Sequence, residues 1–227
     1  MDPAVWPKNA CVNSFFIPTG ATPKSGLSFN PNLMLLNIQS INSDKICDVI
    51  LELNSHKSIN IICLTELWES NDSIGNVNIE GFILASCYLR GNSIRGGGVG
   101  IWVRKGLNFN FNNKLNSRIK QYCVDKHSEF CIISFKDKKN NSYVILNCYR
   151  SPSGDLSIFL NNLEGILNYL YKPNIRFVIC GDFNVDTRNM TNDHVNLFNV
   201  LLNFNINFNL VNWPNRVTDT SVTTLDN

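Results

Sequence analysis

Five polar residues stand at the ends of short apolar runs, in a pattern that could support chemistry. Each of them follows, or ends, a run of buried character such as 33–36 or 177–180. Side chains at strand ends in a rigid scaffold can converge on one ligand, and this set offers carboxylates, amides and a phenol to bind it or exchange protons with it. The five are Asn37, Glu66, Tyr149, Asp182 and Asn184.

Taken one at a time, each of these residues has an ordinary alternative explanation. A carboxylate that ends a strand is usually solvated, and an asparagine there usually makes a turn. Tyr149 has a rival role as a packed aromatic side chain. The pattern becomes informative only when the five residues are considered together.

The elements that must position these residues are many short strands and a few amphipathic helices. Apolar runs predict strands at 33–38, 59–64, 82–87, 99–103, 130–135, 143–149, 176–180 and 207–211. Apolar residues three and four apart predict helices at 43–55, 155–170 and 192–203. Because strands outnumber helices and hairpin-like connections dominate the middle, we expect an α/β fold of two packed sheets flanked by helices.

The helix patterns also predict caps and core-facing residues. Ser43 is expected to be the N-cap of the first helix. The expected inner stripe of the second helix is Phe159, Leu163, Ile166 and Leu170, and that of the third is Val195, Phe198 and Leu202.

Length and composition indicate one large domain with a leader. The chain has 227 residues, of which 44% are hydrophobic and 17% charged, a balance typical of a globular α/β domain. Prolines and glycines punctuate residues 1–31, which we interpret as an irregular leader before a domain at 32–227. The apolar runs are too short to span a bilayer, and no signal peptide is evident. These features predict an intracellular protein, nuclear or cytoplasmic, that is neither secreted nor bound to a membrane.

The cysteines and histidines do not suggest a metal centre of their own. Eight cysteines are scattered without a CxxC pair or a Cys/His cluster, and several lie inside apolar runs. We therefore expect free, buried thiols in a reducing compartment and no structural zinc site. The histidines match no catalytic position and are interpreted as surface or helix residues: His56, His127 and His194.

The distribution of charged residues along the chain is more informative than the net charge. The net charge is only +2, but eleven Lys and Arg residues lie between Arg90 and Lys139 against Asp125, Glu129 and Asp137. This excess of eight positive charges has two interpretations. It is either a solvated face of exposed hairpins or a surface for a phosphate backbone, which needs a patch of one sign.

Three consecutive glycines at Gly96–Gly98 suggest a nucleotide-binding loop at first sight. They lack the GxxxxGK[ST] spacing, and they precede an expected strand, whereas a phosphate loop follows a strand and opens a helix. A tight turn is the better interpretation.

Six segments in a fixed order carry a family resemblance. They are LNIQSI (36–41), IICLTELW (61–68), GGGVGIWVRKG (96–106), VILNCYRSPSG (144–154), FVICGDFNVD (177–186) and LVNWPNRVTDTSVTTLD (210–226). Residues 33–227 thereby resemble the exonuclease–endonuclease–phosphatase superfamily, and more closely the endonuclease domain at the start of non-LTR retrotransposon polyproteins. The Tyr149–Arg150 turn and the last segment favour this branch. The resemblance implies a four-layer α/β sandwich.

The resemblance also implies a site for Mg²⁺, with Mn²⁺ as an alternative. A divalent cation offsets the negative charge that protects a phosphodiester and helps its poor leaving group, and Mg²⁺ accepts one or two carboxylates. By resemblance Glu66 is the metal carboxylate, and Asn37 lies beside it. Asp182 orients or deprotonates the attacking water, while Asn184 and Tyr149 donate to the phosphate as charge develops.

Three further residues enter by the same resemblance. Arg150 either contacts DNA or anchors the 151–154 turn, Thr218 is placed for a contact to the substrate backbone, and Asp226 matches an aspartate that orients a catalytic histidine. In the family this histidine belongs to a Ser-Asp-His segment on the final strand. No such segment occurs before Asn227. We therefore expect the last strands to be missing and the activity of this chain to be weak or absent.

The implied activity is the nicking of target DNA, which leaves a 3′-hydroxyl for a reverse transcriptase domain expected downstream in a full-length relative. Two alternatives stay open at this point. One is a remnant that binds nucleic acid through residues 90–139 without cutting it. The other is a phosphodiesterase or phosphatase of the same fold that acts on a lipid or an inositol phosphate.

Overall fold

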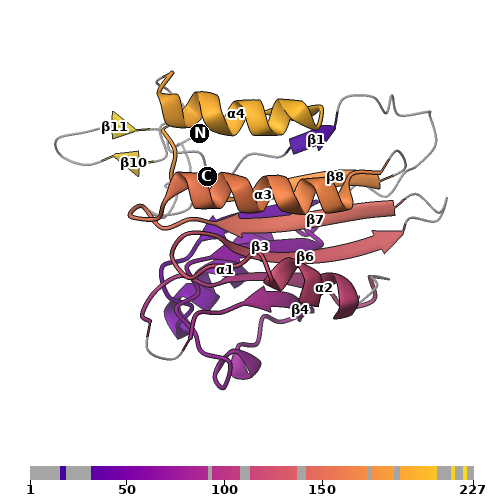
Figure 1. Cartoon of the computed structure of the whole chain (residues 1–227). Coiled ribbons are helices and arrows are strands. Elements are labelled where there is room, and N and C mark those ends of the chain that lie inside the picture. The colour runs from indigo at the N-terminus through magenta and orange to yellow at the C-terminus, as the bar shows by residue number, and fades with distance from the viewer. Residues whose placement is uncertain are drawn as a thin grey trace, which may run out of the picture.

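Two mixed β-sheets form the centre of the protein (Figure 1). A computed structural model of the chain describes residues 16–18, 32–91, 94–107, 113–136, 142–172, 175–186, 190–208, 216–217 and 222–223. The first sheet has the order β2-β3-β5-β4, and its strands are β2 (Leu33–Asn37), β3 (Ile61–Thr65), β4 (Phe82–Tyr88) and β5 (Val99–Arg104). Strand β2 is parallel to β3, and β5 is antiparallel to both of its neighbours.

The second sheet has the order β6-β7-β8. Its strands are β6 (Glu129–Lys136), β7 (Ser142–Tyr149) and β8 (Ile175–Asp182). Strands β7 and β8 are parallel, whereas β6 and β7 are antiparallel. Two short antiparallel pairs lie outside these sheets: β1 (Phe16–Pro18) with β9 (Ile206–Phe208), and β10 (Arg216–Val217) with β11 (Val222–Thr223).

In the part of the chain that the structure describes, the sheets are flanked by four α-helices: α1 (Ser43–Ser55), α2 (Asn113–Lys120), α3 (Leu156–Leu170) and α4 (Asn192–Asn203). A 3-10 turn, η1, spans Ile74–Asn76. Three of the helices begin at polar caps. Asn42, not the expected Ser43, caps α1 by accepting from the Lys45 amide, and Asp155 and Thr191 cap α3 and α4 in the same way.

Alternation along the strands creates an apolar layer between the two sheets. Residues two apart on a strand face the same side. Leu35 and Cys63 of the first sheet therefore meet Ile145 and Cys180 of the second in one buried cluster. Asn147 also lies in this layer, and its Nδ2 donates to the carbonyl oxygens of residues 64 and 100 at 2.9 and 3.1 Å. The side chain thus ties the second sheet to the backbone of the first.

The outer sides of the sheets are covered by helices. Ile62 and Trp102 of the first sheet pack with Val49 and Leu53 of α1. On the opposite side, α3 and α4 cover the second sheet with an apolar cluster centred on residues such as Phe159. Figure 1 shows α3 and α4 together on one side of the sheets, and α1 on the other. The four-layer α/β sandwich expected from the sequence is confirmed.

Most of the expected elements are present, and the differences have physical causes. The inner stripe predicted for α3 is buried as expected. The stripe predicted for α4 is wrong, because Val195, Phe198 and Leu202 are at least 36% exposed while Leu197 and Leu201 are fully buried. Strand β9 begins one residue earlier than predicted, and residues 209–211 of that prediction lie outside the described residues.

Several elements were not predicted because they are short or polar. Helix α2 has the sequence NKLNSRIK, in which apolar residues are too few to mark a helix. Strand β1 lies within residues 1–31, where an irregular leader was expected. It has three residues and depends on pairing with β9, nearly the whole chain away. Pairing at such a distance leaves no local pattern.

The cysteines that the structure describes are free, as predicted, but not all of them are buried. Cys63, Cys131, Cys148 and Cys180 are buried in the sheets, whereas Cys47 and Cys87 are exposed. Among the described residues, no helix is both long and apolar enough to cross a membrane.

Gly181 allows β8 to approach β7 closely. A Cβ atom at this position would lie 1.9 Å from the Cys148 carbonyl oxygen, and the backbone has φ of +142°. Neither condition suits an L side chain. We expect Gly181→Ala to lower the free energy of unfolding by roughly 3 kcal/mol or more, measured by urea denaturation.

Gly75→Ala is the matched control for this prediction. A Cβ atom there would meet nothing within 4 Å. Its effect is therefore expected to stay within about 0.5 kcal/mol. Equal midpoints for the two variants would contradict the steric argument.

Candidate active site between the two sheets

Strand geometry brings three of the five strand-end residues to one place. Asn37 and Asp182 are the last residues of β2 and β8, and they continue the rows of Leu35 and Cys180 that face the other sheet. Tyr149 is the last residue of β7 and pairs with Asp182 in the ladder. These polar side chains therefore replace the apolar layer at one end of the space between the sheets.

The Asn37 amide joins the two carboxylates of the candidate site. Its Nδ2 donates to Glu66 Oε1 at 2.9 Å and to Asp182 Oδ2 at 2.7 Å. Asn37 ends β2 of the first sheet and Glu66 directly follows β3 of that sheet, whereas Asp182 ends β8 of the second. The site is therefore shared by both sheets, as the convergence of strand ends predicted.

Glu66 is held in an unusual backbone conformation. Its φ is +57°, a left-handed value that is rare for residues other than glycine. Backbone hydrogen bonds keep this segment in place from both sides. On one side the amides of Ser40 and Ile41 donate to the carbonyls of residues 66 and 67, and on the other the Leu67 amide donates to the Gly98 carbonyl. Strain of this kind often accompanies functional sites.

Asp182 is a buried carboxyl group with a strongly altered pKa. Asp182 is only 3% exposed to solvent. Burial raises the pKa of Asp182 to about 7, and the neighbouring Glu66 carboxylate acts in the same direction. Hydrogen bonds from Asn37 and from the Asn184 amide, and the charge of Arg150, act in the opposite direction. The group is therefore able to exchange a proton near neutral pH.

Tyr149 is packed as an aromatic side chain, and its hydroxyl lies near the carboxylates of the site. Its ring is buried, and the Arg90 guanidinium lies over it at 5.9 Å. Burial, and then the charges of Glu66 and Asp182, raise the pKa of the Tyr149 hydroxyl, although a hydrogen bond with Ser151 opposes them. The hydroxyl consequently stays protonated at neutral pH and is a hydrogen-bond donor.

Asn184 and Arg150 hold the turn after β8. The Asn184 side chain donates to the Arg150 carbonyl at 2.7 Å, and its backbone amide donates to Asp182 Oδ1 at 3.1 Å. The buried Arg150 guanidinium donates to the carbonyls of Phe183, Asn184 and Gly154 at 2.8, 2.6 and 2.6 Å. Of the two roles expected for Arg150, these contacts support anchoring of the turns over direct contact with a substrate.

A buried ion pair beside the site was missed by the sequence analysis. Arg90 Nε donates to Glu129 Oε1 at 2.6 Å, and Arg90 Nη2 donates to Ser151 Oγ at 2.7 Å. Glu129 also accepts from the amides of Gly98 and Lys126 at 2.6 and 3.1 Å. Burial raises the pKa of Glu129, while the Arg90 charge and these hydrogen bonds lower it. The pair links both sheets to the turn that supports Tyr149.

The glycine segment 96–98 is shaped around this ion pair. A Cβ atom on Gly97 would lie 2.2 Å from Arg90 Nε, and Gly97 has φ of +70°. In place of the tight turn expected at Gly96–Gly98, the chain bends at Gly96, and all three glycines have positive φ. This conformation lets the backbone pass over a buried guanidinium.

The basic residues between 90 and 139 form a surface only in part. Arg90 is buried and paired, and Arg104 donates to the Ile59 carbonyl and lies over the Phe82 ring. The others that the structure describes are exposed: Arg95, Lys105, Lys114, Arg118, Lys120, Lys126 and Lys136. Helix α2 occupies part of this region, where only hairpins were expected.

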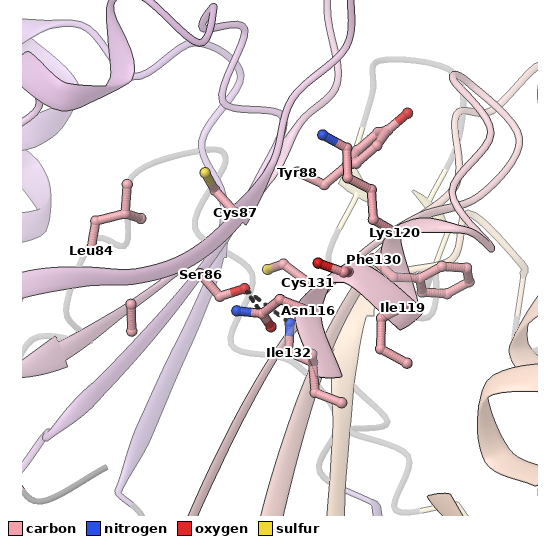
Figure 2. Close-up of a pocket in the computed structure, with 12 residues that line it drawn as sticks. Leu84, Ser86, Cys87, Tyr88, Asn116, Ile119, Lys120, Phe130, Cys131 and Ile132 are labelled. Atoms are coloured by element: carbon pink, nitrogen blue, oxygen red, sulfur yellow. Dashed lines mark hydrogen bonds between the residues drawn. The ribbon is translucent and has the colours of Figure 1, made fainter. Parts of the chain in front are cut away.

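Figure 2 shows a separate pocket of about 340 Å³ between α2 and strands β4 and β6. Ser86 and Ile132 line it, and the Ile132 amide donates to Ser86 Oγ at 3.3 Å. None of the five strand-end residues lines this pocket. The candidate active site is therefore a different feature from this hollow.

The residues present fit Mg²⁺ better than a metal held entirely by protein. Two carboxylates lie within reach of one amide, and the buried Asn37 Oδ1 has no hydrogen-bond partner among the described residues. Mg²⁺ binds through one or two carboxylates and keeps several waters, whereas structural zinc takes four Cys or His ligands. The described residues contain no group of three or more His, Cys, Asp or Glu side chains that could hold a metal.

The other residues considered in the sequence are not among those described at the site. Thr218 and Asp226 are outside the described residues. His56 pairs with a helix residue at the surface, His127 accepts from a loop amide, and His194 lies on α4. All three match the surface or helix positions that the sequence suggested for them.

Comparisons with known proteins identify the fold. A family model described as "Endonuclease/Exonuclease/phosphatase family" matches residues 34–227. No curated protein matches the chain by sequence. Among solved structures, the endonuclease domain of TRAS1, a telomere-specific non-LTR retrotransposon, is similar with a TM-score of 0.55 and 12% identity, over 76% of this chain and 71% of that one.

A second similar structure covers more of the chain. It is an endonuclease/exonuclease/phosphatase family protein from Leptotrichia buccalis C-1013-b, with a TM-score of 0.51 and 12% identity, over 86% of this chain and 85% of that one. At such identities these structures support the fold alone. The match of the family model to nearly all of the sandwich, taken with them, shows that the chain belongs to the Endonuclease/Exonuclease/phosphatase family.

Proposed function

We propose that the protein is a divalent-metal-dependent DNA endonuclease of the non-LTR retrotransposon type. Members of its family are hydrolases of phosphodiesters or phosphate esters. The observation that carries the proposal is the Asn37 amide, which joins the Glu66 and Asp182 carboxylates at one end of the space between the sheets. The retrotransposon class rests on the YR turn, the VNWPNRVT segment and the similarity of fold to the TRAS1 domain.

In this proposal Glu66 and the Asn37 Oδ1 hold the cation. When bound, Mg²⁺ neutralises charge on the phosphate and assists the leaving oxygen. The chain's own residues supply the proton transfer and the hydrogen bonds. Asp182, with its pKa raised to about 7, accepts a proton from the water that attacks phosphorus.

Two donors stand next to Asp182 for the phosphate oxygens. Tyr149 keeps its proton because its pKa is raised, so its hydroxyl donates as charge develops on the phosphate. Asn184 Nδ2 uses one hydrogen on the Arg150 carbonyl and has a second hydrogen for the phosphate. The product of this chemistry is a nick with a 3′-hydroxyl, which a reverse transcriptase extends.

The proposal is tested by nicking of supercoiled plasmid under an excess of protein. We expect slow Mg²⁺-dependent conversion to the open circle, suppressed by EDTA, in keeping with the weak activity expected from the sequence. Glu66→Gln keeps the size of the side chain but removes its charge, so its rate is expected to fall about a hundredfold or more. Glu52→Gln, at the surface of α1, is the matched control and should cut as wild type does.

Equal rates for wild type and Glu66→Gln would rule out this site. A folded wild-type chain that binds plasmid without nicking it would instead support the non-catalytic alternative. Steep weakening of that binding with salt would identify phosphate contacts.

A further inference from the structure

Trp68 is an exposed aromatic residue that belongs directly to the candidate site. It is 39% exposed, although tryptophan side chains usually bury most of their surface. Its Nε1 donates to Glu66 Oε2 at 3.1 Å. One edge of the indole therefore touches the carboxylate expected to hold the metal, while part of the ring stays open to solvent.

Trp68 has a backbone conformation that is unfavourable for a bulky residue. Its φ is +56°, a left-handed value that a bulky side chain rarely adopts. The Trp68 amide donates to the Gly97 carbonyl at 2.9 Å, so the glycine segment keeps the residue in place. Trp68 belongs to none of the buried apolar clusters of the described residues. Packing in the core therefore does not explain its strained conformation.

Arg95 adds a positive charge to the same surface. Its guanidinium carbon lies 5.5 Å from the centre of the Trp68 ring, and Arg95 is exposed. Gly96, next to it, has no side chain, and a Cβ atom there would come within 3.7 Å of Trp68 Nε1. The glycine segment thus brings a guanidinium plane and an indole plane together beside the site.

We propose that Trp68 and Arg95 form a stacking subsite for an unpaired nucleobase next to the phosphate that Tyr149 and Asn184 contact in the proposed function. Flat aromatic side chains beside cationic ones bind single-stranded nucleic acid, because every base offers a π-face and every linkage a negative charge. The inference rests on the proposed function. It adds that the substrate strand contributes a base, and not only its phosphates.

The experiment measures binding and not cleavage. A fluorescently labelled single-stranded oligonucleotide of 12 nucleotides is titrated with the protein in EDTA, beside an oligonucleotide of equal length with central abasic sites. Both carry the same phosphates, so the ratio of their dissociation constants isolates the contribution of the bases. We expect wild type to prefer the intact strand about tenfold or more.

Two replacements of Trp68 separate stacking from positioning of Glu66. Trp68→Leu removes the flat ring, and the preference for intact DNA should disappear. Trp68→Phe keeps a ring but loses the donor to Glu66, so most of the preference should remain. Arg95→Ala should weaken binding of both oligonucleotides and lower the salt slope by about one.

The chain offers a matched control in Tyr169 of α3. This residue is 46% exposed, and the Arg118 guanidinium lies 5.4 Å from its ring centre, as in the Trp68–Arg95 pair. Tyr169→Leu should leave the preference unchanged, and circular dichroism verifies that each variant is folded.

A wild-type protein without any preference would overturn the proposal, as would a Trp68→Leu variant that keeps it. The proposal would also be overturned if Tyr169→Leu lost the preference for the intact oligonucleotide as completely as Trp68→Leu. Failure of the nicking test leaves this binding result unaffected, so the two proposals are judged separately.

Discussion

Asp182→Asn is expected to make the metal-free protein more stable above pH 7 and to slow nicking strongly. The buried Asp182 carboxyl has its pKa raised to about 7, so ionising it inside the protein is unfavourable. Asparagine keeps the shape and removes the charge. The loss of a general base is expected to lower the nicking rate by about 10²–10⁴-fold. A substitution that raises stability but lowers activity is typical of a position where a functional residue is held in an unfavourable environment.

The pH dependence of this effect has a defined sign. In the unfolded chain an aspartate has a pKa near its model value of 3.8. The folded protein therefore holds the proton more tightly than the unfolded chain between that value and about 7. The contribution of Asp182 to stability is fully present below the unfolded pKa and is lost as the pH rises through the folded pKa. A shift of about three units corresponds to a loss on the order of 4 kcal/mol.

This prediction is measured by urea denaturation of wild type and Asp182→Asn in EDTA from pH 4.5 to 8. The difference between the two proteins cancels the titration of other groups. The stability of wild type should fall relative to that of the variant as the pH rises. Mg²⁺ held by Glu66 and Asn37 should stabilise both proteins, and its charge beside the Asp182 carboxylate should make the relative fall of wild type smaller. A difference that stays constant over this range would show that Asp182 titrates normally.

Removing one partner of the Arg90–Glu129 pair is expected to destabilise the protein strongly. Both side chains are at most 5% exposed, and Glu129 accepts four hydrogen bonds or ion-pair contacts from Arg90, Gly98 and Lys126. Glu129→Ala leaves the Arg90 guanidinium buried without its counter-charge. The expected loss in the free energy of unfolding is about 3–5 kcal/mol.

The matching double variant distinguishes pairing from the size of the side chains. Arg90→Met together with Glu129→Leu removes both charges, so its loss should be smaller than the sum of the losses in the single variants Arg90→Met and Glu129→Leu. The exposed His56–Glu52 pair is the control, and Glu52→Ala should change stability by less than about 1 kcal/mol. Additive losses in the double variant would contradict a pairwise role for this contact.

The sequence predicted the layers because the apolar residues alternate. Within a strand, every second residue faces the same side. Leu35 of β2, Ile145 of β7 and Cys180 of β8 belong to such rows, and the structure places them between the sheets. The stripe of α4 shows where the pattern is ambiguous. Val195, Phe198 and Leu202 have the same spacing as His194, Leu197 and Leu201, so periodicity alone does not select the buried face.

The candidate site was predictable where its residues end strands. Asn37, Glu66 and Asp182 converge as expected from strand geometry and from the family resemblance. Glu129 and Trp68 were missed for a different reason. Glu129 is 39 residues from its partner, and the exposure of Trp68 follows from a backbone conformation that no local pattern encodes.

The thiols between the sheets make it possible to measure how often the two sheets separate. Cys63 of β3, Cys131 of β6 and Cys180 of β8 are fully shielded or nearly so, and burial raises the pKa of Cys63 and Cys131. Alkylating reagents react with the thiolate and need access to it. These cysteines are therefore modified only when the layers separate. Their rate of modification therefore measures how often the two sheets separate. Because the two halves of the site belong to different sheets, the same rate shows how long the site stays assembled between openings.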